Sequence, residues 1–208
     1  MKFKKDGADV CPETRSDSRS DDSSDNPVVS DPTSGRIDVF CKIDPKATLY
    51  IHQLLNEFAK KRGRGIGKKS KITIVVNTRG GEALQGLAIY DLIRSSGLDV
   101  MTVVLGEVAS SGLVVALAGK KRRMHQNAIL HFHRTAMQFD VPRAVVEWDE
   151  ADRERAQSKV VDDMYAAITL GNSNLTRKEL EDLERREAYM TAPEALKAGL
   201  IHEIIKHF

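Results

Sequence analysis

The sequence lacks the features that mark several large classes of protein. It has two cysteines, Cys11 and Cys41, and they form no pair of the kind that binds a metal. No apolar run is long enough for a membrane span or for the hydrophobic part of a signal peptide. Its 32 Lys and Arg nearly balance 30 Asp and Glu, so a net charge of +2 indicates neither a nucleic-acid nor a membrane partner. We therefore expect a cytoplasmic protein with reduced cysteines.

The length and the apolar content are sufficient for one well-buried core. The chain has 208 residues, of which 41% are hydrophobic, and it is too short for two large domains. Residues 1–35 are rich in Ser and Asp, more acidic than basic, and almost without apolar periodicity. Such a segment buries too little surface to order itself. We expect a disordered leader at 1–35 and one folded domain at 36–208.

Hydrophobic periodicity predicts alternating strands and helices from residue 71 onward. Strands are expected at 72–77 and 100–105, and each is followed by a helix, at 82–96 and 111–118. This alternation predicts a mostly parallel sheet with right-handed crossovers. The same criteria predict further strands at 37–43, 122–125, 128–133 and 200–205, a helix at 47–61, and a short helix opened by the capping-box pattern at 191–194.

A long charged helix is expected at 141–170, and its apolar residues recur on one side. These residues are Val160, Val161, Met164, Tyr165 and Ile168. A domain of this size would leave part of such a face exposed to water. We therefore expect a projecting helix that contacts a partner, and a protein that is not a monomer.

The basic, glycine-containing run at 60–71 resembles a phosphate-binding loop only in composition. A phosphate-binding loop follows a strand and opens a helix, whereas this run follows a helix and precedes a strand. We interpret it as a solvated loop, with an anion or nucleic-acid contact as the alternative.

Two strand-to-helix turns carry residues that can support catalysis. Ser110 and Ser111 open a buried helix, where a hydroxyl lies beside N–H groups that lack helical partners. Gly80 and Gly81 occupy the equivalent place in the preceding unit and can leave an N–H free to bind an oxyanion. Both turns should lie at one edge of the parallel sheet. Each also has a simpler interpretation, because Ser commonly caps helices and paired glycines commonly form tight turns.

A nucleophilic serine requires a base, and two histidines are candidates. His131 and His133 lie two residues apart on an expected strand, so both point to the same face. A third group must orient the imidazole, but carboxylates are too numerous for their spacing to select one.

Five ordered segments between about residues 71 and 205 together resemble the proteolytic subunit of the Clp protease, a family of serine peptidases. The segments are NTRGG at 77–81, AIYD at 88–91, ASSG at 109–112, NAILHFHR at 127–134 and YMTAPEA at 189–195. The first is similar to the Asn-Ser-Pro-Gly-Gly turn of that family, and the third is similar to its nucleophile segment, Ala-Ser-Met-Gly. The fourth resembles the strand that ends in the catalytic histidine.

The resemblance implies an α/β fold of the ClpP and crotonase type, with repeated β-β-α (strand-helix) units and a mostly parallel sheet. By position, it makes Ser110 the nucleophile and His133 the general base and acid. The backbone N–H groups of Gly81 and Ser111 would form the oxyanion hole. Glu187 stands where the family has aspartate, so its longer side chain requires a compensating backbone position to orient His133.

The same resemblance implies a serine endopeptidase that hydrolyses peptides or unfolded proteins without a metal or a cofactor. It implies a homo-oligomer, commonly of two stacked heptameric rings, supplied by an ATP-driven unfoldase. One alternative is a catalytically silent ring subunit or scaffold, in which Glu187 fails to hold His133. Another is a crotonase-like relative that stabilises a thioester enolate, although Ser110 and His133 together argue against it.

Overall fold

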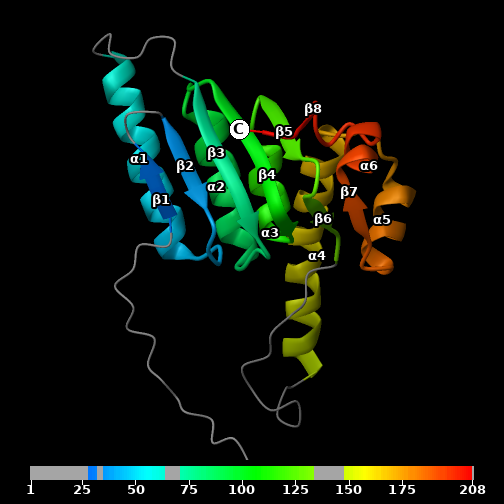
Figure 1. Ribbon diagram of the computed structural model, residues 1–208. Helices are drawn as coiled ribbons and strands as arrows, with labels where there is room; N and C mark the ends of the chain where they lie inside the picture. Colours follow the sequence, from blue (N-terminus) through cyan, green and yellow to red (C-terminus); the bar gives the residue numbers. More distant parts are fainter. Residues whose placement is uncertain (1–27, 32–34, 64–70, 134–147, 208) are drawn as a thin grey trace, which may run out of the picture.

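One eight-stranded sheet forms the centre of the computed structural model, which describes residues 28–31, 35–63, 71–133 and 148–207 (Figure 1). The strand order is β1-β2-β3-β4-β5-β8, and β6 pairs with both β4 and β7. The strands are β1 (Val28–Asp31), β2 (Arg36–Val39), β3 (Ile72–Thr78), β4 (Val100–Ala109), β5 (Lys121–His125), β6 (Ile129–His131), β7 (Tyr189–Thr191) and β8 (Glu203–Ile205). The helices are α1 (Pro45–Gly63), α2 (Ala83–Ser95), α3 (Ser111–Leu117), α4 (Trp148–Gly171), α5 (Arg177–Arg185) and α6 (Ala192–Lys197).

The sheet is mostly parallel, as the alternating pattern predicts. Strands β2 to β5 pair in parallel, and so do β4 with β6 and β5 with β8. Only β1 with β2 and β6 with β7 are antiparallel within the described residues. Since β3 and β4 run in the same direction, the turns that follow them meet at one edge of the sheet.

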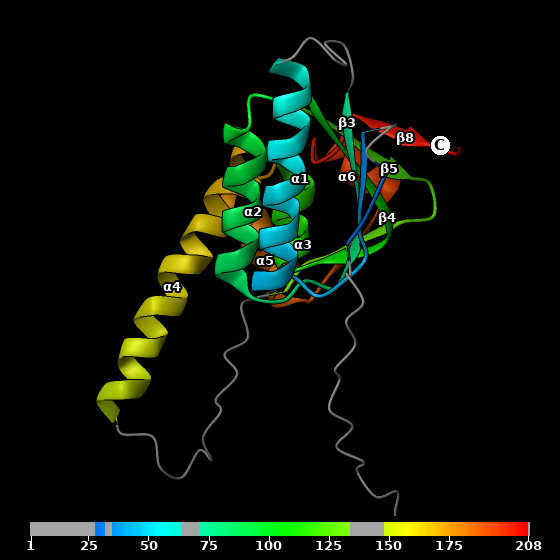
Figure 2. The same ribbon diagram turned by 90° about the vertical axis from the view of Figure 1, so that its left-hand side faces the viewer.

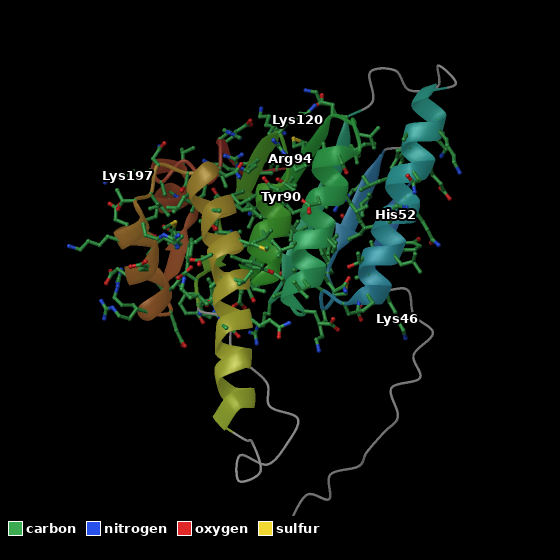
Figure 3. All side chains as sticks on the ribbon, turned by 180° about the vertical axis from the view of Figure 1, so that it is seen from behind. Lys46, His52, Tyr90, Arg94, Lys120 and Lys197 are labelled. Carbon is green, nitrogen blue, oxygen red and sulfur yellow. The ribbon has the colours of Figure 1, made fainter. Side chains whose placement is uncertain are left out.

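Helices α1, α2 and α3 lie together on one face of the sheet (Figure 2). Seen from that side, α1, α2 and α4 lie across the molecule in front of the strands (Figure 3). The core lies between these layers, where Ile74 and Val76 of β3 and Val104 of β4 are buried. On the opposite face of the sheet, Val75 and Val103 form a smaller apolar cluster with the end of the chain. The alternation of the two sets along β3 and β4 explains why both strands are predicted so clearly.

The first strand corrects the expected boundary between leader and domain. Residues 28–31 fall within the expected leader but form β1, which pairs with β2 from Val28 opposite Val39 to Asp31 opposite Arg36. Val28 is 1% exposed and belongs to the core. The pairing and this burial stabilise a segment whose own composition does not predict a strand. The rest of the expected leader, residues 1–27 and 32–34, lies outside the described residues.

Helix α4 confirms the long helix from residue 148 onward and extends beyond the sheet (Figure 2). Its predicted apolar face divides into two parts. Val161 is buried, and the Tyr165 hydroxyl donates a hydrogen bond to the Ala83 carbonyl at 2.8 Å. Val160 and Met164 are 55% and 48% exposed. Residues 141–147 of the expected helix and residues 64–70 of the basic run lie outside the described residues.

The segment that carries α5 and β7 contains elements that the periodicity did not predict. Helix α5 opens with a capping box, in which Glu179 N–H donates to Thr176 Oγ1 at 3.3 Å and Thr176 N–H donates to Glu179 Oε2 at 2.8 Å. The predicted capping box at Thr191 opens α6, where Thr191 N–H donates to Glu194 Oε2 at 2.7 Å. The last strand, β8, is shorter than the range expected from the sequence.

A buried arginine attaches the end of α4 to the sheet. Arg122 of β5 is 9% exposed, and its Nε donates to the Leu200 carbonyl at 2.7 Å. Its terminal nitrogens donate to the side chain and the carbonyl of Asn172 and to the Gly199 carbonyl. Burial lowers the pKa of the Arg122 guanidinium, and the surrounding carbonyl oxygens replace the water it has lost.

Candidate active site

Ser110 has an unusual backbone conformation at the turn from β4 into α3. Its φ of 53° and ψ of −128° lie outside the regions that residues other than glycine favour, at a cost on the order of 1–3 kcal/mol. Its side chain makes no capping hydrogen bond to α3, every residue of which is described. Ser110 is therefore not the ordinary helix cap of the simpler interpretation. A strained serine between a strand and a helix is typical of the nucleophile turn in hydrolases.

Gly80 packs directly against this turn. Its φ is +96°, and a Cβ added to it would lie 2.8 Å from Ser110 Cβ and 3.0 Å from Ser111 N. Only glycine fits such an approach without a shift of the backbone. The Asn77–Gly81 turn and the Ser110 turn are thus in contact, as their equivalent places in the two units predict.

Gly81 is held by the segment that follows β2. Ile43 N–H donates to the Gly80 carbonyl at 3.0 Å, and Glu82 N–H donates to the Ile43 carbonyl at 2.8 Å. In a parallel bridge of this kind, the central residue directs its own N–H to the side away from its partner. The Gly81 N–H therefore faces the side of the sheet on which β4 and Ser110 lie, where an oxyanion would need a donor.

The pairing of β6 with β7 leaves His133 and Glu187 near the same end of this strand pair. His131 pairs with Tyr189, and Phe132 N–H donates to the Ala188 carbonyl at 2.9 Å. The extended pairing ends there, because Glu187 has a φ of 48° and belongs to the turn after α5. Because β6 also pairs in parallel with β4 up to Ala109 opposite His131, His133 follows the strand that lies next to the Ser110 turn. Glu187 precedes β7, which lies on the other side of β6.

Glu187 is the second residue other than glycine with a positive φ among the described residues, at 48°. It follows α5 in a left-handed C-terminal turn, in which Glu187 N–H donates to the Glu184 carbonyl and Ala188 N–H donates to the Leu183 carbonyl. Glycine is the usual residue at this position. The turn sets the backbone direction from which the longer Glu187 side chain starts, and this side chain is exposed.

His131 shares a face with His133, as predicted, but has different neighbours. The two ring centroids are 5.6 Å apart. The His131 ring stacks on Tyr189 at 4.2 Å between centroids, and its Nδ1 lies 3.6 Å from Glu107 Oε1. The other carboxylate oxygen of Glu107 accepts a hydrogen bond from Arg79 Nε at 2.9 Å.

The sequence did not reveal this cluster of Arg79, Glu107, His131 and Tyr189. Its four residues come from three strands and a turn, and no local spacing connects them. One signal was available, because Arg79 and the two histidines lie in segments already singled out by their motifs.

Two adjoining hollows follow the carboxyl edge of the sheet. The larger, of about 640 Å³, lies along the turns after β2 and β3 and is lined in part by Phe40, Lys42 and Gly81. The smaller, of about 270 Å³, contains His131, His133 and Tyr189. Arg79 and Glu107 line both hollows and form the wall between them. An extended peptide laid along this edge would pass the Gly80–Gly81 turn and the Ser110 turn.

Metal and membrane sites are not found in the part of the chain that the structure describes. No three His, Cys, Asp or Glu residues there are grouped so that they could hold a metal ion. No helix within the described ranges is long and apolar enough to cross a membrane.

Comparisons with known proteins agree with this architecture. A sequence model of the Clp protease family, described as "Clp protease", matches residues 45–208. ATP-dependent Clp protease proteolytic subunit 2 of Chlamydia pneumoniae is 30% identical over 165 residues, which are 78% of this chain and 75% of that protein. The ATP-dependent Clp protease proteolytic subunit of Porphyromonas gingivalis is 30% identical over 142 residues, 65% of this chain and 60% of that protein.

A solved structure shows the same fold at lower sequence identity. A mutant of ClpP1 from Listeria monocytogenes superimposes with a TM-score of 0.71 at 20% identity, over 85% of this chain and 94% of that one. The α/β fold with a mostly parallel sheet, predicted from the sequence, is thereby confirmed. The family match and the similar relatives together show that the chain belongs to the Clp protease family, a family of serine-type peptidases.

Proposed function

We propose that the protein is a serine endopeptidase in which Ser110 is the nucleophile, His133 the base and acid, and Glu187 the group that orients His133. The observation that carries the proposal is the strained Ser110 turn, which is packed against Gly80 and leaves its hydroxyl out of any helix cap. Family membership supports the reaction class, and the β6–β7 pairing leaves His133 and Glu187 near the same end of one strand pair.

The proposed reaction has two halves. Ser110 Oγ attacks the peptide carbonyl while His133 accepts its proton, and the N–H groups of Gly81 and Ser111 stabilise the oxyanion. His133 then protonates the leaving amine, and an acyl-enzyme remains on Ser110. In the second half, a water molecule activated by His133 attacks the acyl carbon and releases the second product.

We further propose that the protein acts as a homo-oligomeric ring, of the heptameric kind that the resemblance implies, with an ATP-driven unfoldase as partner. The similar proteins of Chlamydia pneumoniae and Porphyromonas gingivalis are named as subunits of an ATP-dependent protease. The exposed apolar residues Val160 and Met164 on α4 offer a surface for assembly.

A catalytically silent ring subunit is the second candidate. The observation that favours it is the exposed, left-handed position of Glu187, because a carboxylate held by solvent orients an imidazole less strictly than a buried one.

Covalent labelling separates the two candidates. A fluorophosphonate probe should add one phosphonyl group to the wild-type chain, as measured by intact-mass spectrometry, and none to Ser110→Ala. The matched control is Ser111→Ala, which keeps the backbone donor and should still be labelled. A wild-type chain that stays unlabelled, with its fold intact by circular dichroism, would support the silent subunit instead.

A further inference from the structure

The wall between the two hollows is an ion pair placed next to the proposed nucleophile. Arg79 directly precedes the Gly80–Gly81 turn, and Glu107 lies on β4 three residues before Ser110. Their contact, Arg79 Nε to Glu107 Oε2 at 2.9 Å, joins the turn after β3 to the neighbouring strand β4. Both residues of the pair line both hollows.

Both carboxylate oxygens of Glu107, the negative partner of the pair, already lie next to positively charged or polar groups of the protein. One oxygen of Glu107 accepts from Arg79, the other lies 3.6 Å from His131 Nδ1, and the side chain is 22% exposed. Arg79 is 87% exposed, and its bond to Glu107 uses Nε alone. No other hydrogen bond of Arg79 is found among the described residues, so its terminal nitrogens are available to bind a carboxylate with two parallel hydrogen bonds.

A second cation lines the larger hollow without an acidic partner among the described residues. This residue is Lys42. The acids near it are used elsewhere, since Asp44 accepts from Ala47 N–H at the start of α1 and Asp38 binds Arg36 at 2.7 Å. The residues that line the two hollows thus include two cations, Lys42 and Arg79, and one carboxylate, that of Glu107.

We propose that this wall makes the site select peptides that carry an acidic side chain close to the bond that Ser110 attacks. This inference rests on the proposed function in one respect, namely that the peptide bound along this edge is the substrate that Ser110 cleaves. Arg79 and Lys42 bind the carboxylate, and the stacked rings of His131 and Tyr189 pack against the neighbouring part of the peptide. A lysine at the same position would face both cations and be disfavoured.

Binding to an inactive protein tests the selection without requiring catalysis. We would use the full-length Ser110→Ala chain and fluorescein-labelled peptides that differ only by Glu, Gln or Lys at each position in turn along a neutral sequence. At one position, the Glu peptide should bind about fivefold more tightly than the Gln peptide, the upper range for an exposed ion pair. The Lys peptide should bind less tightly than both, and added salt should reduce the differences. Fluorescence anisotropy measures all three affinities.

Charge-removing variants assign the effect to the wall. Arg79→Gln, added to Ser110→Ala, uncovers Glu107 and should turn the preference toward the Lys peptide. Glu107→Gln releases Arg79 and should increase the preference for the Glu peptide. The matched control is Arg94→Gln, because Arg94 lies near the far end of α2 on the helix-covered side of the molecule (Figure 3). It should leave the order of affinities unchanged.

Several results would overturn the proposal. They are equal binding of the Glu and Gln peptides at every position, no binding of any peptide, or an acidic preference that survives Arg79→Gln. Labelling of wild-type Ser110 together with equal binding would refute the selection and leave the peptidase proposal standing. An acidic preference in a chain whose Ser110 is never labelled would support the selection and refute the peptidase.

Discussion

The residues of the candidate site are distinguished by backbone geometry more than by side-chain chemistry. Among the described residues other than glycine, Ser110 and Glu187 are the two with a positive φ. Both are proposed catalytic residues. Such conformations persist only where the surrounding structure holds them, and they are concentrated at functional sites. At Ser110 the holding contact is Gly80, and at Glu187 it is the C-terminal turn of α5.

The two histidines should differ sharply in their effect on peptidase activity. We expect His133→Ala to lower kcat/KM for a peptide by about a thousandfold or more, because it removes the group that moves the proton. His131→Ala should cost much less, since the contacts of His131 are with Tyr189 and Glu107 and the proposed proton transfer does not use it. Glu187→Gln should fall between them, because it perturbs orientation without removing a reacting group. A severe loss in His131→Ala with a mild one in His133→Ala would instead assign catalysis to the Glu107–His131 pair.

Gly81 is the residue at which a single methyl group should do most harm. A Cβ at Gly81 would lie 2.2 Å from the Ile43 carbonyl oxygen, so Gly81→Ala must push the two backbones apart. We expect a loss of stability of about 1–3 kcal/mol, seen as a lower Tm, together with reduced probe labelling of Ser110. Gly171→Ala is the control, because a Cβ at Gly171 meets no atom within 4 Å. An unchanged Tm in Gly81→Ala would show that the turn is less tightly held than its geometry indicates.

At the scale of elements, the edge strand β1 should contribute measurably to stability. A chain that starts at Gly35 loses the pairing with β2 and the burial of Val28, which is 1% exposed. Burial of one large aliphatic side chain stabilises a fold by about 2 kcal/mol. We therefore expect this chain to unfold at a lower urea concentration than one that starts at Asn26.

A point substitution tests β1 if the shorter chain is insoluble. Val28→Ser in the full-length chain keeps the backbone pairing but removes most of the buried apolar side chain. It should therefore lower the urea midpoint by less than removal of β1 does. Equal midpoints for all these chains would mean that β1 adds nothing to the stability of the sheet.

At the scale of the whole molecule, the surface of α4 predicts self-association. Val160 and Met164 are 55% and 48% exposed on a helix that extends beyond the sheet. Sedimentation velocity at micromolar concentration should show a species several times heavier than the 23.1 kDa chain. Met164→Glu should shift the distribution toward that chain mass, because a carboxylate resists transfer from water into an apolar interface. The control is Leu49→Glu, a similar change at an exposed position of α1. A wild-type protein that sediments only as a monomer would contradict the prediction.

The order of the main elements and the segments that hold the candidate site could be predicted from the sequence alone. Strands β3 and β4 and helices α2 and α3 lie close to their predicted ranges, because burial repeats along each with its own period. The turns at Gly80–Gly81 and Ser110 could also be predicted, because each is marked by a short motif of consecutive residues. The start of α5 also has a local sequence signal, the capping box of Thr176 and Glu179. This helix was not predicted from the sequence.

Which of these segments meet could not be predicted from the sequence and is seen in the folded protein. Strands β1 and β7 have 4 and 3 residues, so they owe their conformation to the strands they pair with rather than to their own composition. The β6–β7 pairing brings the ends that carry His133 and Glu187 together, and the Arg79–Glu107 pair joins residues 28 positions apart. Periodicity reports which face of an element is apolar. It carries no information on strand register or on contacts across the sheet, and the charged wall beside Ser110 consists entirely of such contacts.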